Sequence, residues 1–442
     1  MGRKPIDVEK LAMDLIMSDD ISVKRALAKK IFDIAYKKGI YPSSIHEFYI
    51  TRGKGEFPGG FTVPAVNLRS MTYDLARAMF RVAKKNNAGA FIFEIAKSEM
   101  GYTAQPPIEY SSVILAAAIK EGYSGPVFIQ GDHVQVNLKK FQENSEKEIE
   151  SLQALIADAV EAGFYNIDID SSTLVDLSKA SIKKQQYLNY EVCAKLTQFI
   201  RKVEPKGVTV SVGGEIGEVG HQNSTPEDLR AFMEGYKERL RKGRIGISKI
   251  SVQTGTSHGG VVLPDGSVAQ VKLDFDTLKN LSEIARKEFG MSGAVQHGAS
   301  TLPEELFHKF PEVDTAEIHL ATGFQNMIYE SKNFPAELKS KMYEWLKVNA
   351  VSERKEGETD EQFFYKTRKK ALGQFKKEIM CMPQDVRDAI SKEIEEKFEF
   401  LFKQLNAVNN KELIDKYVPL KRVIIRKRGE KTEVHHDGEG AD

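Results

Sequence analysis

The feature that most constrains this chain is a repeated alternation of short strand-like runs with longer helical stretches. From about residue 60, each run of β-branched and aromatic residues is followed by a segment with helical spacing, as in βα units. Eight such runs occur, at FTVPAV (61–66), AGAFIFEI (88–95), PVFIQ (126–130), YNIDID (165–170), VTVSVG (208–213), SKISVQT (248–254), GAVQ (293–296) and TAEIHLA (315–321).

Eight parallel strands with intervening helices favour a closed (β/α)8 barrel, the TIM barrel fold. An open doubly wound sheet is the alternative, but no GxGxxG sequence follows the first run. Helices are expected at 72–86, 144–162, 226–242 and 275–289. Thr225 and Pro226 would begin the third of these, because a hydroxyl caps a helix and proline is tolerated in its first turn.

Four segments are expected along the chain. The barrel would occupy residues 56–330, after an N-terminal helical extension over 1–55 with helices at 8–17 and 23–38 that covers the bottom or an edge of the barrel. A Lys- and Glu-rich C-terminal helical extension would follow over 331–425, and a disordered tail over 426–442. Contacts in a homo-oligomer, which we expect, or packing back on the same barrel would explain the C-terminal extension.

The balance of charge points to a small-molecule ligand. The 64 basic and 63 acidic residues nearly cancel, so neither nucleic acid nor an anionic membrane is expected as the main partner. Only two cysteines occur, Cys193 and Cys381, which excludes a cysteine-rich zinc site and fits a reducing compartment. With no signal peptide or long apolar span in the sequence, we expect a cytoplasmic protein.

Histidines follow three of the expected strands. Barrel enzymes carry their chemistry at the C-terminal ends of the strands, and His133, His258 and His297 all stand there. Three imidazoles suit Zn²⁺ and leave a coordination position open for substrate. Any one of them alone could be a core or capping residue, but together they predict one catalytic divalent ion.

Other polar groups stand at the same strand ends. Asp132 precedes His133 and could transfer a proton to or from a substrate hydroxyl, although a supporting or capping role is the alternative. Glu215 could bind a cation, orient a ligand or remain a solvated loop residue. The small residues of GTSHGG (255–260) and HGAS (297–300) would let backbone N–H groups approach an anion.

At these residues the sequence resembles the class II, metal-dependent fructose-bisphosphate and tagatose-bisphosphate aldolases, over about 61–322. The segments that carry the resemblance, in the family's order, are VPAVN (63–67), GDH (131–133), IDIDSS (167–172), VSVGGEIGEVG (210–220), SVQTGTSHGG (251–260), KLDFDTL (272–278), HGAS (297–300) and IHLATG (318–323).

The resemblance implies a zinc ion on His133, His258 and His297, with Mn²⁺ or Co²⁺ as other options, that polarises a ketose carbonyl and stabilises an enediolate. Asp132 would move the proton on the hydroxyl where the carbon–carbon bond breaks, and Glu215 matches a glutamate of the metal region. The substrate, a sugar phosphate, would be held by Asn67, Gly259, Gly298, Ser300, His319 and Thr322.

Several positions depart from the family pattern. Gly213 stands where a glutamate is usual, and Glu94 and Ala96 replace a Gln-x-Ser pair. Val261, Val262 and Leu263 stand where a lysine is often found, while His319 replaces an asparagine. Glu94 would disfavour a nearby phosphate unless it is paired or turned away. The base that removes the ketose proton stays unassigned, with Glu218 and His221 in a suitable loop.

The leading hypothesis is reversible retro-aldol cleavage of a ketose phosphate, such as fructose 1,6-bisphosphate, to dihydroxyacetone phosphate and an aldehyde phosphate. The altered pocket leaves open a metal-dependent sugar or sugar-acid epimerase that works by the same bond cleavage and re-addition. A non-catalytic partner subunit of tagatose-bisphosphate aldolase is the third hypothesis, although such a subunit should lack a full histidine triad.

Overall fold

A closed ring of eight parallel strands forms the centre of the computed structural model, which describes residues 7–217, 222–255, 273–299 and 302–424. The strands are β2 (Val63–Asn67), β3 (Ile92–Ala96), β4 (Gly125–Gln135), β5 (Asn166–Asp170), β6 (Ser211–Glu215), β7 (Lys249–Val252), β8 (Ala294–Gln296) and β9 (Glu317–Leu320). Each pairs with its neighbour along the chain, and β9 pairs back with β2. The predicted TIM barrel is confirmed, and the open sheet is excluded.

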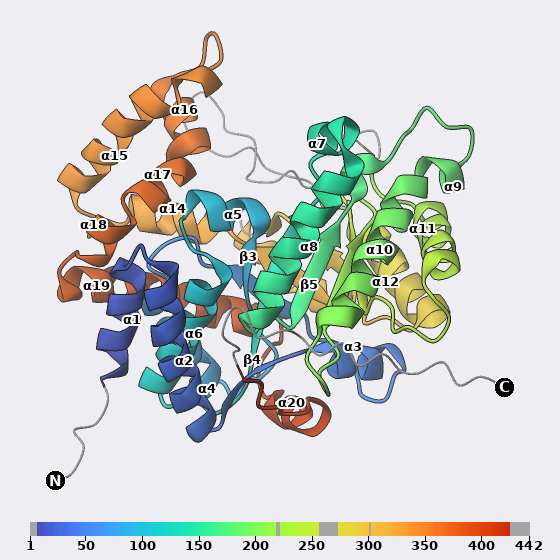
Figure 1. Cartoon of the computed structure of the whole chain (residues 1–442), viewed down its shortest axis with the longest axis horizontal. Helices are drawn as coiled ribbons and strands as arrows, with labels where there is room; N and C mark the ends of the chain where they lie inside the picture. Colours follow the sequence, from blue (N-terminus) through green and yellow to red (C-terminus); the bar gives the residue numbers. More distant parts are fainter. Residues whose placement is uncertain (1–6, 218–221, 256–272, 300–301, 425–442) are drawn as a thin grey trace.

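Helices cover the outside of the ring (Figure 1). The main ones are α4 (Thr72–Lys85), α6 (Pro107–Lys120), α8 (Ser145–Glu161), α10 (Tyr187–Val203), α11 (Pro226–Arg239), α12 (Phe275–Phe289) and α14 (Thr322–Glu330). Shorter turns are α5 (Lys97–Tyr102), α7 (Leu138–Glu143), η1 (Ser172–Leu174), α9 (Ile182–Gln185), η3 (Glu304–Leu306) and α13 (Lys309–Glu312). As expected, Thr225 caps α11: its hydroxyl accepts from the Asp228 amide at 3.1 Å.

The N-terminal segment contains the two expected helices, α1 (Val8–Met17) and α2 (Ile21–Lys37), and two elements that the sequence pattern did not predict. Both helices pack on α6, which is therefore buried on its outer side as well and is rich in alanine and serine. The additional strand β1 (Ile40–Ser43) pairs with the start of β4. The additional helix α3 (His46–Gly53) lies near the N-terminal end of the barrel, where the Tyr49 hydroxyl donates to Glu317 Oε2 at 2.5 Å.

The C-terminal helices return to the barrel. They are α15 (Ala336–Asn349), η4 (Val351–Glu353), α16 (Asp360–Thr367), η5 (Arg368–Lys370), α17 (Ala371–Gln374), α18 (Lys376–Met380), α19 (Gln384–Gln404) and α20 (Lys411–Tyr417). The long helix α19 packs along α4, where Arg387 forms a buried ion pair with Asp74 at 2.9 Å. Packing on the same chain thus accounts for this segment. The expected tail at 426–442 lies outside the described residues.

One close approach positions the C-terminal helices beside the open end of the barrel. Helix α17 contacts α5, and a Cβ atom at Gly373 would lie 2.6 Å from the Tyr102 carbonyl oxygen. Only glycine therefore lets α17 and the preceding turn η5 come this near. Among the helices of the described ranges, none is both long and apolar enough to cross a membrane.

Candidate active site

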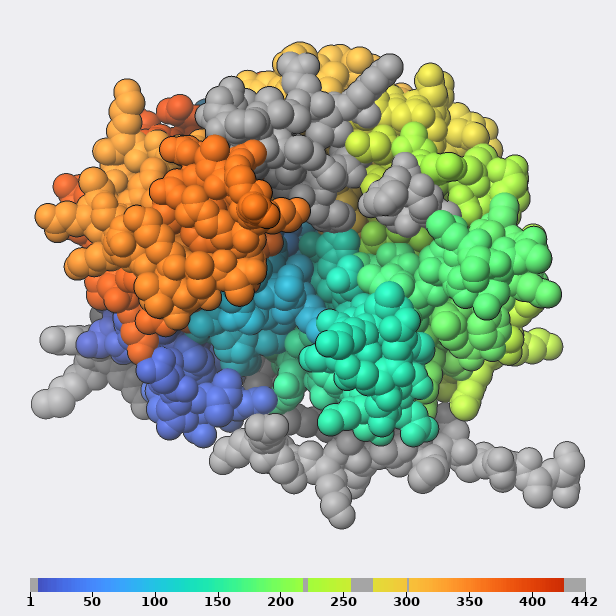
Figure 2. Space-filling view, turned by 90° about the horizontal axis from the view of Figure 1, so that it is seen from above, coloured from blue at the N-terminus to red at the C-terminus, as the bar shows by residue number. Residues whose placement is uncertain are grey.

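A cavity of about 530 Å³ opens at the C-terminal ends of the strands. Figure 2 looks onto this end of the molecule, where the orange segment with α16 and the teal segment with α7 stand on opposite sides of a hollow. Residues at the ends of β2, β3, β4, β8 and β9 line the cavity, and one residue of η5 joins them. The location is the one expected for the chemistry of a barrel enzyme.

A bulge in β4 brings two consecutive side chains to this cavity. The pairing of β4 with β5 shifts between Gly131 and Val134, and His133 has a left-handed backbone with φ of 39°. In a regular strand, neighbours would point to opposite faces of the sheet. The bulge re-aims them, so that Asp132 and His133 both line the cavity.

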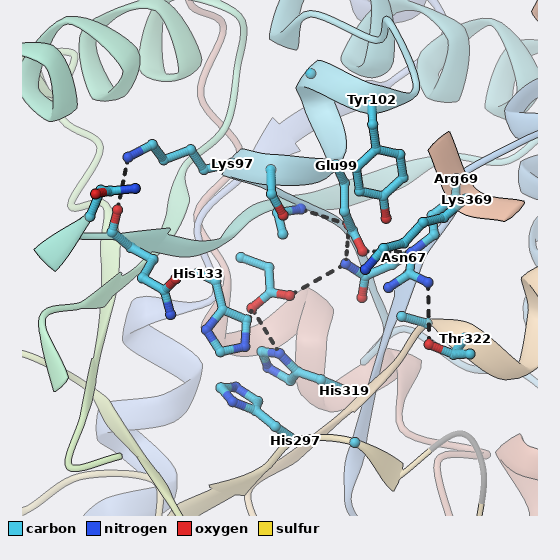
Figure 3. A pocket seen from close by; sticks show the side chains of 18 residues that line it. Asn67, Arg69, Lys97, Glu99, Tyr102, His133, His297, His319, Thr322 and Lys369 are labelled. Carbon is cyan, nitrogen blue, oxygen red and sulfur yellow. Dashed lines mark hydrogen bonds and ion pairs between the residues drawn. The ribbon is translucent and has the colours of Figure 1, made fainter. Parts of the chain in front are cut away.

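His133 and His297 lie side by side, with ring centroids 4.2 Å apart (Figure 3). Glu215 bridges behind them, with one carboxylate oxygen 3.4 Å from His133 Nδ1 and the other 3.7 Å from His297 Nδ1. Asp170 Oδ2 lies 3.0 Å from His133 Nδ1. A carboxylate behind an imidazole is the usual support of a metal-binding histidine. We call His133, His297, Glu215 and Asp170 the mouth group.

The pKa values of the mouth group differ between its two histidines. Burial and then His133 lower the pKa of His297 to about 4. Burial acts in the same direction on His133, but Asp132 and Glu215 outweigh it and hold the His133 pKa well above its ordinary value. Burial would raise the pKa of Glu215, yet the two histidines keep it well below the usual range. The two adjacent imidazoles thus share one positive charge, which lies on His133.

These residues fit a divalent ion. The donor atoms of Asp132, His133 and His297 all lie within 4.8 Å of one another, and imidazole with carboxylate is a donor set that Zn²⁺ accepts. The third expected ligand, His258, lies outside the described residues, as do Gly259, Ser300, Glu218 and His221.

The other expected site residues converge on Asp132. Asn67 Nδ2 donates to Asp132 Oδ2 at 3.3 Å, and His319 Nδ1 lies 3.1 Å from Asp132 Oδ1 (Figure 3). Asn67, Gly298, His319 and Thr322 all line the cavity. The described members of the expected substrate set therefore line the same cavity as the expected proton carrier, and two of them contact it.

A family model for class II fructose-bisphosphate aldolase matches residues 57–406, which include the barrel and the C-terminal helices through α19. The chain belongs to the class II aldolase family. No curated protein matches it. The chain is also similar to two solved structures of low sequence identity. A protein named as a tagatose 6 phosphate kinase from Sinorhizobium meliloti 1021 is 14% identical, with 80% of this chain and 99% of that chain covered and a TM-score of 0.54.

The second is a fructose-bisphosphate aldolase from Campylobacter jejuni. It is 19% identical, with 81% of this chain and 93% of that chain covered and a TM-score of 0.48. At such low identity, a structural likeness is informative about the fold alone.

Cations that the sequence did not single out lie at the rim of the aldolase cavity. Arg69 Nε donates to Glu99 Oε1 at 2.6 Å, and its Nη1 lies 3.2 Å from the Thr322 hydroxyl. Lys369, from η5, lines the same cavity and has its ammonium 5.8 Å from the centre of the Tyr102 ring. Loss of water around Lys369, and then repulsion from Arg69, lower the pKa of its ammonium. Two neighbouring cations can hold an anionic substrate group.

A second set of charged residues fills the barrel below Asp132. We call it the interior group: Glu94, Asp168, Lys249, Glu317 and His319, each at most 5% exposed. The Lys249 ammonium lies 2.9 Å from Asp168 and 2.5 Å from Glu317, and it donates to the Gln130 side chain at 2.7 Å. TIM barrels ordinarily fill this space with branched apolar side chains.

The interior group explains two departures from the family pattern. A Cβ atom at Gly213 would overlap Asp168 Oδ1 and approach Lys249 Cε to 3.0 Å, so the Asp168–Lys249 pair occupies the space of a larger side chain. Glu94 accepts from Gln130 Nε2 at 2.8 Å and lies 3.3 Å from His319 Nδ1. Glu94 is thus paired inside the barrel. This pairing meets the condition set from the sequence, under which Glu94 would not disfavour a nearby phosphate.

Proposed function

We propose that this protein catalyses reversible, metal-dependent retro-aldol cleavage of a ketose phosphate such as fructose 1,6-bisphosphate, giving dihydroxyacetone phosphate and an aldehyde phosphate. The observation that carries the proposal is the placement of Asp132 beside the histidine pair, at one wall of one cavity. Membership of the class II aldolase family supports the reaction type.

The metal would be held by His133 and His297, with His258 as the third ligand. A divalent ion there, which we propose to be zinc, supplies a Lewis acid that polarises the ketose carbonyl. Glu215 and Asp170 orient the imidazoles from behind, through the contacts at 3.0–3.7 Å described above. Because His133 carries a proton when no metal is bound, metal binding releases that proton.

Asp132 would act as the proton carrier. When the carbon–carbon bond breaks, its electron pair moves toward the ketose carbonyl and the hydroxyl proton of the departing aldehyde passes to Asp132. Asn67 fixes Asp132 Oδ2, and Glu99 holds Asn67 in turn, because Asn67 Nδ2 donates to Glu99 Oε2 at 2.6 Å. This support keeps the carboxylate in one orientation at the cavity wall.

The charged end of the substrate would bind Arg69, Lys369 and Thr322. Arg69 and Lys369 bring two cations to the rim beside Glu99, and such a pair suits a phosphate group. A cation from the C-terminal helices would compensate for the lysine absent at 261–263, a segment outside the described residues.

Chelation with and without metal restoration tests the proposal. Removal of bound metal should abolish cleavage of fructose 1,6-bisphosphate, and added Zn²⁺ should restore it. His297→Ala should show no cleavage, whereas His308→Ala, at a histidine with 49% of its side chain exposed, should behave like wild type. Undiminished cleavage after chelation would refute the proposal.

An epimerase is the second candidate, favoured by the changed wall at Asp132, where His319 stands in place of an amide. Cleavage followed by re-addition of the aldehyde on its other face would interconvert two ketoses. Chromatography of the products separates the candidates, since an aldolase releases two fragments and an epimerase returns a single isomeric sugar. The presence of Asp132, His133 and His297 together argues against a non-catalytic subunit.

A further inference from the structure

Three potential metal ligands meet at the top of the interior group. His319 Nδ1 lies 3.1 Å from Asp132 Oδ1 and 3.3 Å from Glu94 Oε2, and donor atoms of the three residues all lie within 4.8 Å of one another. Ligand atoms bound to one ion at about 2.0–2.2 Å are themselves about 3.0–3.5 Å apart. The two distances from His319 already match the spacing of a coordination sphere, and the donor atoms of Asp132 and Glu94 lie within 4.8 Å of each other.

Neighbouring side chains fix the orientation of these groups, in the way that hydrogen-bond partners fix the ligands of a metal ion. His319 Nε2 lies 2.7 Å from Glu317 Oε1, so a proton on Nε2 leaves the Nδ1 lone pair directed at Asp132 and Glu94. Gln130 donates to Glu94 Oε2 and fixes the glutamate. Glu94 is fully buried, yet its Oε1 has no hydrogen-bond partner among the described residues. A buried carboxylate oxygen without a donor indicates a missing ligand.

The charge count of the barrel interior indicates that the ligand is a cation. Among the described interior residues, four carboxyl groups, those of Glu94, Asp132, Asp168 and Glu317, accompany only two basic groups, the Lys249 ammonium and the His319 imidazole. The mouth group adds two more carboxyl groups, those of Glu215 and Asp170, beside His133. Uncompensated buried charge is costly, and a divalent ion would neutralise the excess.

We propose that Glu94, Asp132 and His319 bind a second divalent cation, separate from the ion expected at His133 and His297. Asp132 then lies between two metal sites. Its Oδ1 faces the second cation, while its Oδ2 stays with Asn67 on the cavity side. The cation would be zinc or manganese, which accept mixed imidazole and carboxylate ligands.

Metal stoichiometry of the full-length chain tests this proposal without any enzyme assay. Protein stripped by a chelator is saturated with Zn²⁺ or Mn²⁺, freed of excess metal and analysed for bound ion by mass spectrometry. We expect two ions per chain for wild type and one for Glu94→Gln and His319→Asn, each of which keeps a similar side-chain size. His297→Ala should also retain one ion, because it damages only the other site.

Glu109→Gln is the matched control, since it removes another carboxylate that is only 1% exposed, in α6, and should leave two ions bound. Circular dichroism of each variant verifies folding. With Mn²⁺, spin–spin coupling between the two ions should be visible by electron paramagnetic resonance in wild type and absent in both site variants. One ion per chain in wild type, or two ions in Glu94→Gln and in His319→Asn, would overturn the proposal. Neither result would affect the proposed cleavage reaction.

Discussion

The mouth group and the interior group contain the same kinds of side chains and meet at Asp132, but they differ in access to solvent. His133 and Glu215 keep 17% and 13% of their side chains exposed, with Asp170 and His297 behind them at 2% and 7%, whereas Glu94 and Glu317 keep none. An accessible charged group can exchange protons and ligands with water, while a fully buried one depends on fixed partners. Residue type alone therefore does not separate groups that react from buried groups whose charge must be neutralised by fixed neighbours.

If the two groups differ in this way, substitutions in the mouth group should lower activity most and stability least. His297→Ala should reduce cleavage by about 10³- to 10⁴-fold, because polarisation of the carbonyl contributes several kcal/mol to transition-state stabilisation. Steady-state kinetics with saturating zinc measures the loss. A thermal midpoint far below that of wild type would contradict the expected separation of activity from stability.

The interior group should show the reverse behaviour. Lys249→Met leaves Asp168 and Glu317 without their cation and should lower the free energy of unfolding by about 3–5 kcal/mol. Urea denaturation measures the change. Arg230→Ala, which breaks an exposed pair with Glu288, is the control and should change the free energy of unfolding little, because solvent screens this pair. A Lys249 variant as stable as this control would show that the interior charges are not compensated as the structure indicates.

Asp170 tests the role of a supporting carboxylate within the mouth group. Asp170→Asn keeps the shape of the side chain but weakens its hold on His133 Nδ1, so metal affinity should fall by about 10- to 100-fold. Competition with a chromogenic chelator measures the metal dissociation constant. The variant should still cleave substrate when metal is in excess, and unchanged affinity would assign Asp170 a purely structural role.

The smallest expected effect lies at the rim of the cavity. Lys369→Ala should raise KM for a phosphorylated ketose by about 3- to 10-fold with little change in kcat, because one charge-assisted contact is lost at an accessible position. Lys370→Ala is the matched control, since Lys370 lies on the same turn but pairs with Glu353. An equal KM for the two variants would remove Lys369 from the substrate site.

The strands and the mouth histidines were predictable from the sequence because their signals are local. Each strand is a short β-branched run, and His133 and His297 directly follow such runs. β1 was missed because IYPS is short and contains Pro42, which argues against a strand except at an edge. Arg69 and Lys369 were missed because they come together only when α17 packs on α5 and brings the preceding turn η5 to the cavity, and no local pattern reports that contact.

The interior group left a weaker signal in the sequence. Glu317 and His319 are two residues apart in β9 and therefore face the same side of the strand. Alternation alone cannot tell the inside of a barrel from its outside, and the ordinary expectation places charged residues outside. The position of Gly213 against Asp168 became meaningful only in three dimensions.

The close approach at Gly373 has a consequence for how this protein can diversify. On the proposed function, the residues that break the carbon–carbon bond belong to the barrel. Part of substrate selection depends instead on residues 368–374, which contact the barrel from outside. Mutations in that turn can alter which sugar is accepted while every residue of the mouth group stays unchanged. Directed evolution limited to this segment would be an economical route to an enzyme with a new substrate and the old reaction.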